Sequence, residues 1–154
     1  MQLTRFTDYS LRVLIAVALG DEKGTTISRI AAQFGISRNH LMKVVHRLSK
    51  AGYLETLRGR GGGLRLAVAP DSIGLGDIVR ATEADFHLVP CFDEARSDSC
   101  PIVPACVLKR ALERGMRGFL GVLDEYTLAD LIKPARRLRE LLEPQPRSAS
   151  AGYP

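Results

Sequence analysis

The side chains best suited to chemistry in this sequence are its three cysteines, Cys91, Cys100 and Cys106, which all lie within 17 residues that begin at Pro90. Three thiols cannot all pair with one another, so metal ligation or redox sensing is favoured over a set of disulfides. Zinc ribbons use close C-x2-C pairs, and none occurs in the spacing C-x8-C-x5-C. Ligands separated by wide gaps suit a larger object, such as an iron–sulfur cluster. Zinc and unmetallated thiols remain the alternatives.

Three thiolates leave one coordination position to be filled. An iron held there by a weak oxygen ligand or by solvent is open to attack by a small molecule, so three cysteines suit a sensor better than four. Cys106 alone could be an ordinary buried cysteine, whereas Cys91 and Cys100 stand among polar, loop-forming residues. The nearby candidates for the fourth position are Asp85, His87, Asp93, Glu94 and Asp98.

Composition limits the classes of protein that the chain can be. It has 154 residues, 45% of them hydrophobic, which is enough for one compact domain with an appended arm. There is no apolar run long enough to span a bilayer and no signal-peptide pattern, so we expect a cytoplasmic protein whose thiols stay reduced. No G-x-S-x-G, H-E-x-x-H or Walker motif occurs, so we do not expect an enzyme.

The positive charge is concentrated in the first half of the chain. Residues 1–70 contain 11 Lys and Arg against 4 Asp and Glu, a net charge of +7. Residues 71–154 contain 11 against 13, a net charge of −2. A basic half suggests a polyanionic partner, although an ordinary basic surface would have the same composition.

Residues 26–51 carry the strongest local pattern. Thr26 and Ser37 are typical helix caps, and Gly35 supplies a turn between two segments of apolar residues at helical spacing. The pattern predicts a helix-turn-helix. The second helix turns four aliphatic residues to the core, and its opposite face can enter the major groove of DNA or be an ordinary solvated surface. The candidate DNA-binding residues of this helix are Arg38, Asn39, His40, Lys43, His46, Arg47 and Lys50.

Two short segments with strand composition, 53–57 and 64–68, follow this helix and predict a β-hairpin. Its tip is rich in glycine and carries Arg58 and Arg60, and Arg65 lies on the second strand. A hairpin directly after a recognition helix is the wing of a winged helix, and an arginine on it can enter a narrow minor groove. A phosphate-binding loop is excluded because the segment has no G-x-x-x-x-G-K-[ST] and opens no helix.

The remaining segments predict further helices. A first helix covers 4–19, where Asp8 suits the positive end of the helix dipole. A short helix covers 75–83, and an irregular loop follows it to 104. A long helix at 105–125 carries a coiled-coil-like seam, which predicts a two-fold dimer. A final helix runs to about 142 and is interrupted by Pro134.

Together these elements predict a mainly α fold with a small β-hairpin wing, a winged helix-turn-helix followed by a long dimerisation helix. We expect four parts. Residues 1–83 form a DNA-binding domain and 84–104 a cluster-binding loop. Residues 105–143 form the dimerisation and C-terminal helices, and 144–154 form a disordered tail.

Several motifs together resemble one known family, the dimeric winged-helix iron–sulfur repressors. They are M-Q-L-T-R-F-T-D-Y-S-L-R at 1–12, S-R-N-H-L-M-K-V-V at 37–45, L-S-K-A-G-Y at 48–53, R-G-R-G-G-G-L-R-L at 58–66, C-P-I-V-P-A-C-x-L-K at 100–109 and L-D-E-Y-T-L-A-D-L at 123–131. The resemblance covers about residues 1–132. It is closer to the nitric-oxide-sensing branch than to the IscR-like branch, whose members place a histidine three residues after the last cysteine, where this chain has Lys109.

This resemblance implies a homodimeric transcriptional repressor of a palindromic double-stranded DNA operator, with no membrane partner. The three cysteines would hold an iron–sulfur cluster, [4Fe-4S] or alternatively [2Fe-2S], and Asp8 of the other subunit would supply the fourth ligand. Nitric oxide would attack the iron, the bond to Asp8 would break, and the two recognition helices would lose their spacing. The alternatives are a regulator that responds to iron–sulfur supply or redox state, and a zinc- or thiol-stabilised DNA-binding protein without a cluster.

Overall fold

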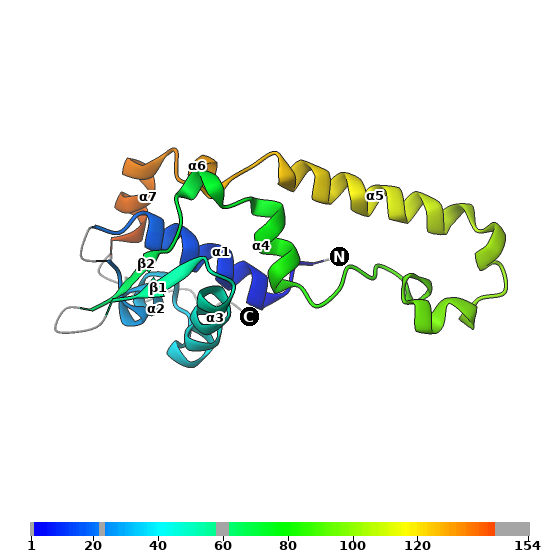
Figure 1. Ribbon diagram of the computed structural model, residues 1–154, viewed down its shortest axis with the longest axis horizontal. Coiled ribbons are helices and arrows are strands. Elements are labelled where there is room, and N and C mark those ends of the chain that lie inside the picture. The colour runs from blue at the N-terminus through cyan, green and yellow to red at the C-terminus, as the bar shows by residue number, and fades with distance from the viewer. Residues whose placement is uncertain (1, 22–23, 58–61, 144–154) are drawn as a thin grey trace, which may run out of the picture.

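The computed structural model describes residues 2–21, 24–57 and 62–143, with only the backbone described at 97–99. Figure 1 shows a compact body at one end and a long arm that projects from it. The helices are α1 (Arg5–Ala18), α2 (Ile27–Phe34), α3 (Arg38–Lys50), α4 (Leu75–Thr82), α5 (Val107–Asp124), α6 (Leu128–Leu131) and α7 (Ala135–Leu142), and the strands are β1 (Leu54–Thr56) and β2 (Leu64–Leu66). The prediction of a mainly α fold with a small hairpin is confirmed.

The first three helices begin where the sequence places a capping hydroxyl. Thr4, Thr26 and Ser37 each accept a hydrogen bond from the backbone N–H three residues later, at 3.3, 3.2 and 3.3 Å. These bonds satisfy N–H groups that have no partner inside the helix. Gly35 ends α2 with φ 66°, a left-handed conformation that favours glycine, and so turns the chain into α3. The predicted helix-turn-helix is therefore present with its predicted caps.

The two strands form an antiparallel pair in which Leu54 lies opposite Leu66 and Glu55 lies opposite Arg65. Both strands are shorter than predicted. The chain before α2 joins the same sheet, because Thr25 and Leu64 exchange two backbone hydrogen bonds of 3.2 and 2.7 Å. The predicted tip residues Arg58 and Arg60 lie outside the described residues.

The core of the body is built around α1, which packs against α2, α3, α4 and β2. Its largest fully buried side chains come from five helices and the loop before α4, and include Leu14, Ile30, Leu41, Leu48, Ile73, Ile78 and Leu128. Burial of each such aliphatic side chain contributes about 1.5–3 kcal/mol of hydrophobic free energy. The core therefore fixes α3 on the body with its other face outward.

The segment 84–104 differs from the predicted irregular loop. It contains three short 3-10 helices, Pro90–Phe92, Glu94–Ser99 and Val103–Ala105. Pro90 and Pro104 each stand in the first turn of such a helix, where a missing N–H costs no hydrogen bond. The Asp93 side chain caps the middle one by accepting a hydrogen bond from the Ala95 N–H at 3.0 Å. Two of these three helices therefore begin with a proline in the first turn.

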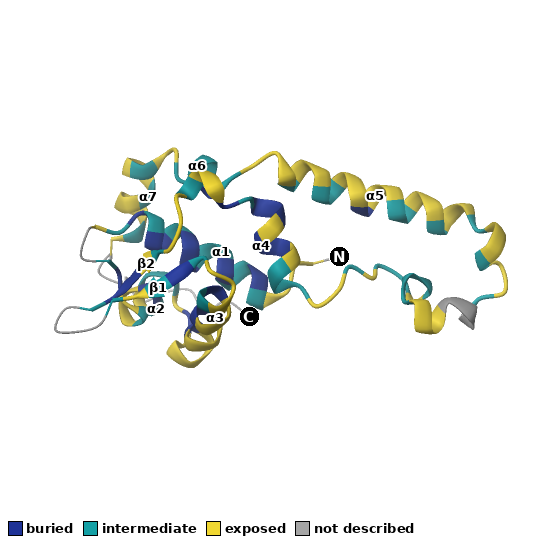
Figure 2. Ribbon diagram, viewed as in Figure 1, coloured by how far each residue is buried: buried dark blue, intermediate teal, exposed yellow. Residues whose placement is uncertain are grey.

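Helix α5 forms the length of the arm, and most of its surface is exposed (Figure 2). Met116 is its one buried residue among the described positions. After it, Asp130 accepts hydrogen bonds from the N–H and hydroxyl of Thr127 at 2.8 and 2.9 Å, which starts α6. Pro134 then separates α6 from α7, as its position predicts. Among the described residues, no helix is long and apolar enough to cross a membrane.

Candidate DNA interface and metal-binding arm

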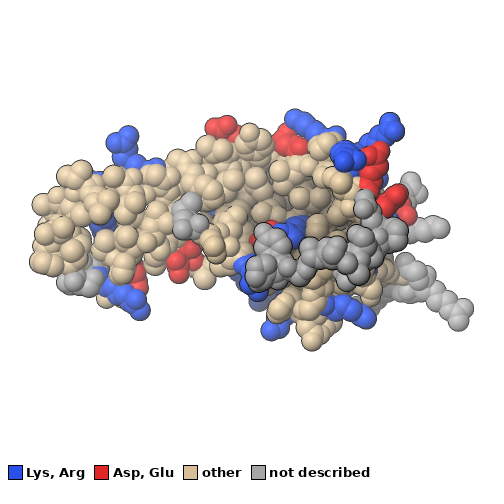
Figure 3. Space-filling view, turned by 180° about the vertical axis from the view of Figure 1, so that it is seen from behind, with Lys and Arg blue, Asp and Glu red and all other residues tan. Residues whose placement is uncertain are grey.

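The outer face of α3 is the most strongly basic surface that one element presents. The helix contains no Asp or Glu, and all seven of its predicted DNA-binding residues are exposed. Figure 3 shows Lys and Arg side chains projecting from the lower edge of the body, where α3 lies. Within the described part of the chain, no side-chain hydrogen bond or ion pair engages Arg38, Asn39, Lys43, His46 or Lys50. These five are free to meet a polyanion.

Two other predicted residues of α3 already have partners in the protein. Arg47 donates from Nε and Nη2 to the backbone carbonyl of Ala81, at 3.3 and 3.1 Å, and so bridges to the end of α4. The ring of His40 lies 6.3 Å from that of Tyr9 on α1. Arg47 is therefore placed to orient α3 as well as to offer charge.

The described part of the wing also carries an internal pair. Arg65 and Glu55 face each other across the two strands, with Nε 2.7 Å from the carboxylate. Such an exposed pair stabilises the fold little, but the Glu55 carboxylate offsets the positive charge that Arg65 can offer to DNA. Sequence reasoning also missed Met42, which is 49% exposed on α3 and could meet a thymine methyl group.

Asp8 lies in α1, where both carboxylate oxygens contact Arg12 one turn later. Nε is 2.9 Å from Oδ1 and Nη2 is 2.9 Å from Oδ2. The guanidinium carbon of Arg12 also stands 5.8 Å from the ring centre of Phe34 on α2, a cation–π distance. The Asp8 side chain is 43% exposed, so a second molecule can reach it. The i, i+4 spacing of Asp8 and Arg12 was a signal in the sequence for this pair.

The three cysteines all lie on the arm and are half-buried and unpaired. Cys91 stands in the first 3-10 helix of the segment, Cys100 follows the second, and Cys106 caps α5. The sulfur of Cys106 accepts a hydrogen bond from the Lys109 N–H at 3.3 Å. A negative charge on this sulfur would be stabilised by the N-terminal end of an 18-residue helix.

The predicted local candidates for a fourth ligand are already engaged with neighbours. Asp85 accepts a hydrogen bond from the His87 N–H at 2.9 Å, and Asp93 caps a 3-10 helix and pairs with Arg96 at 3.7 Å. Glu94 also has an interaction partner. The side chain of Asp98 lies outside the described part. The contacts of these residues do not mark any one of them as the fourth ligand.

Among the described residues, no three His, Cys, Asp or Glu side chains are gathered as a ready metal site. The donor set nevertheless fits an iron–sulfur cluster in kind, because three free thiols on one segment are the soft ligands that such clusters use. The three thiols must draw together for this, and the short 3-10 turns that carry them are weaker than α-helices. Lys109 extends along α5 toward Glu113, with Nζ 3.9 Å from its carboxylate.

Comparison with known proteins gives consistent matches over nearly the whole chain. The sequence model of the Rrf2 family, described as iron-dependent transcriptional regulator, matches residues 3–134. The HTH-type transcriptional regulator NsrR of Bacillus subtilis strain 168 is 50% identical over 145 residues, which cover 93% of this chain and 98% of that protein. The solved structure of oxidized CymR from Staphylococcus aureus superposes with a TM-score of 0.69 at 28% identity, covering 86% of this chain and 97% of its own. That of T. potens IscR has a TM-score of 0.67 at 26% identity, with coverages of 90% and 91%.

Proposed function

This chain belongs to the Rrf2 family of iron-dependent transcriptional regulators, and we propose that it is a dimeric DNA-binding repressor that senses nitric oxide through an iron–sulfur cluster. The family consists of transcriptional regulators, so the chain is not an enzyme. The observation that carries the proposal is that the basic helix and the cysteines lie in different parts of the molecule. The body presents α3, with five exposed side chains that no described residue engages, and the arm holds the three free thiols.

The proposed DNA-binding surface is the outer face of α3 together with the wing. Asn39 can pair with an adenine edge, and Lys43 and Lys50 can reach guanine or phosphate. Arg38, at the first turn, suits a backbone phosphate. The full proposed set is Arg38, Asn39, His40, Lys43, His46, Arg47, Lys50 and Arg65, with Arg58 and Arg60 of the wing tip.

The proposed dimer forms through α5. Three apolar side chains of this helix are largely exposed to solvent: Val107 at 69%, Leu108 at 64% and Val122 at 54%. A group of exposed apolar side chains on one helix is typical of a protein–protein interface. The glycines at 115, 118 and 121 have nothing within 4 Å of the position that a Cβ would take. Glycine in a helix interior costs about 1 kcal/mol relative to alanine, and close approach of a second helix would offset that cost. A two-fold dimer through this face would present two recognition helices to a palindromic operator.

The proposed cluster ligands are Cys91, Cys100 and Cys106 of one subunit and Asp8 of the other. When bound, a [4Fe-4S] or [2Fe-2S] cluster supplies iron that reacts with nitric oxide. The motifs that resemble nitric-oxide-sensing repressors, and Lys109 in place of a histidine ligand, support this assignment. The site would operate in a reducing cytoplasm, where thiolates stay available.

Contacts within the protein connect Asp8 to the recognition helix α3. Asp8 lies on the helix that packs directly on α3, and its neighbour Tyr9 contacts His40. Arg12 offers Asp8 an alternative partner and stands over Phe34 of α2. Asp8 would therefore exchange between two partners, the cluster on the arm of the other subunit and Arg12 of its own helix. Each of the two bound states would favour a different orientation of one DNA-binding body relative to the other.

The test uses protein purified without oxygen and a duplex that this protein selects from a random library. Binding is followed by fluorescence anisotropy while nitric oxide is added. We expect tight binding that is lost in proportion to the nitric oxide consumed. Binding that persists after full reaction would contradict nitric oxide as the signal.

A further inference from the structure

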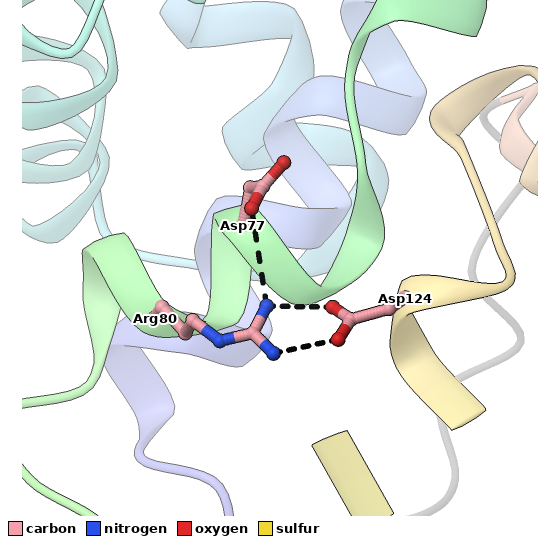
Figure 4. Close-up of polar contacts among 3 residues, drawn as sticks. All are labelled: Asp77, Arg80 and Asp124. Carbon is pink, nitrogen blue, oxygen red and sulfur yellow. Dashed lines mark hydrogen bonds and ion pairs between the residues drawn. The ribbon is translucent and has the colours of Figure 1, made fainter. Parts of the chain in front are cut away.

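An ion pair between α4 and the last residue of α5 helps to join the arm to the body. Arg80 donates from Nη1 and Nη2 to the two carboxylate oxygens of Asp124, at 2.6 and 2.7 Å (Figure 4). Asp77, one turn earlier on α4, stands 3.8 Å from the same guanidinium. The hydrogen bonds lower the pKa of the Asp124 carboxyl and raise that of Arg80. A two-pronged contact of this kind fixes direction as well as distance.

Gly76 makes this contact possible. It is buried in the first turn of α4, directly against the Asp124 carboxylate. A Cβ at this position would overlap Asp124 Oδ1 and lie 2.7 Å from Arg80 Nη1. A side chain at position 76 would therefore force the Asp124 carboxylate and the Arg80 guanidinium out of this arrangement.

The backbone holds the same junction from the other side. The Leu75 N–H donates to the Tyr126 carbonyl at 2.8 Å, and the Leu128 N–H donates to the Ile73 carbonyl at 2.8 Å. These bonds pair the chain before α4 with the chain after α5. The arm consequently leaves the body at a fixed angle.

The far end of α4 is bonded to the recognition helix α3 and to the start of the core helix α1. The Ala81 carbonyl accepts the two hydrogen bonds of Arg47 from α3. Glu83, the next residue but one, accepts hydrogen bonds from the N–H and hydroxyl of Thr4 at the start of α1, at 2.7 and 3.2 Å. One short helix thus touches the arm at its beginning and the recognition helix at its end.

We propose that α4 couples the arm to the recognition helix, and that Gly76, Arg80, Asp124 and Arg47 are positioning residues that set the separation of the two DNA-binding heads. This inference rests on the proposed function only in requiring a dimer that binds two half-sites. The side chains of Arg80 and Asp124 are 40% and 45% exposed, so the pair should add little to stability. Its effect should appear in geometry, since half-sites must lie about one helical turn apart.

The experiment measures binding of the dimeric, cluster-loaded protein to duplexes whose half-sites are at the selected spacing or shifted by one base pair either way. The variants are Asp124→Asn, Arg80→Met and the conservative Arg80→Lys, with Glu140→Gln in the exposed pair of α7 as the matched control. We expect Asp124→Asn and Arg80→Met to lower the preference for the selected spacing by about fivefold or more. Arg80→Lys should keep part of the preference, and Glu140→Gln all of it.

Binding to unrelated DNA and iron content should be unchanged in all four variants, because the DNA-facing side chains and thiols are intact. Full retention of the spacing preference in Asp124→Asn and Arg80→Met would overturn the inference. If an Arg80 variant does not fold, the spacing preference of Asp124→Asn alone decides the test, because this substitution barely changes the side-chain volume.

A second readout does not depend on DNA. Hydrogen exchange in Asp124→Asn should speed up in α4 and in the last turn of α3, with α7 unchanged. If the wild-type protein selects no specific duplex, the proposed function fails, and this readout still tests the coupling. Unchanged exchange in α3 would overturn it.

Discussion

The Asp8 carboxylate and the Arg12 guanidinium face each other across one turn of α1, with two contacts of 2.9 Å. This pair occupies the carboxylate that the proposed dimer needs as a ligand. Both side chains are more than 40% exposed, so the pair is weak and can open. Asp8 is therefore held in place but not committed.

Replacement of Asp8 by alanine should separate cluster binding from DNA binding. We expect Asp8→Ala to retain iron and sulfide through its three thiolates, and to lose operator affinity by about tenfold or more, because the tie between the arm and α1 is absent. Anaerobic anisotropy titrations with metal analysis check this, with Asp71→Ala as control. Equal operator affinity in Asp8→Ala and wild type, before and after nitric oxide, would contradict the role of Asp8.

Two residues of α3 should report different kinds of DNA contact. Lys43→Ala should weaken binding to all sequences and reduce the slope of log affinity against log salt concentration by about 1. Asn39→Ala should leave the slope unchanged and cost about 1–3 kcal/mol of discrimination at one base pair. Arg136→Ala, on exposed α7, is the control for lost charge. If Arg136→Ala reduced the slope of log affinity against log salt concentration as much as Lys43→Ala does, the effect could not be assigned to a contact of α3 with DNA.

Arg47 should behave differently from its neighbours. Because its guanidinium is bound to the Ala81 carbonyl, we expect Arg47→Ala to lower operator affinity with a smaller reduction in salt slope than Lys43→Ala produces. Arg47→Lys, which cannot make the forked contact, should resemble Arg47→Ala. A slope reduced by about 1 would assign Arg47 to the phosphate backbone instead.

The exposed apolar face of α5 should be needed for association. Leu108→Asp places a charge on this face, and we expect a monomer with unchanged helical content, because Leu108 contributes little to the core of the body. Sedimentation equilibrium measures the mass. Leu141→Asp, at another exposed leucine, on α7, should remain dimeric. A dimeric Leu108→Asp protein would mean that another surface joins the subunits.

The start of α6 should be sensitive to strong acid. Hydrogen bonds from Lys133 and Thr127 lower the pKa of Asp130 to about 2. Because this pKa is lower in the folded chain than in the unfolded chain, the stabilisation is complete above about pH 4 and is lost as the pH falls through about 2. The carboxyl resonance of Asp130 and the exchange of the Leu128 amide should change together over this range. Asp130→Asn should show no such change in the Leu128 amide.

Local features of the sequence predicted the body well. The hydroxyl caps, the left-handed Gly35 and the aliphatic spacing of α3 act within one or two turns of chain, so the residues themselves determine the result. The prediction of an irregular loop up to residue 104 missed the short 3-10 helices there. Pro90 and Pro104 are compatible with them, because a proline in the first turn of a helix costs no hydrogen bond.

Long-range contacts could not be predicted in the same way. Arg80 and Asp124 are 44 positions apart, and no local pattern distinguishes them from other exposed charged residues. Gly76 has no unusual backbone angle, and its importance follows only from what α5 brings against it. The proposed site of three thiols and Asp8 requires a second chain, so neither a local pattern nor a single subunit could predict it.

The most direct test of the account is the iron and acid-labile sulfide content of protein purified without oxygen, with its absorption spectrum before and after nitric oxide. The account predicts a coloured protein that contains iron and sulfide, bleaches as nitric oxide is added and then releases its duplex. Cys91→Ser, Cys100→Ser and Cys106→Ser should each lose the colour. A colourless protein with one zinc per chain, or with no metal and unchanged DNA binding, would contradict the account.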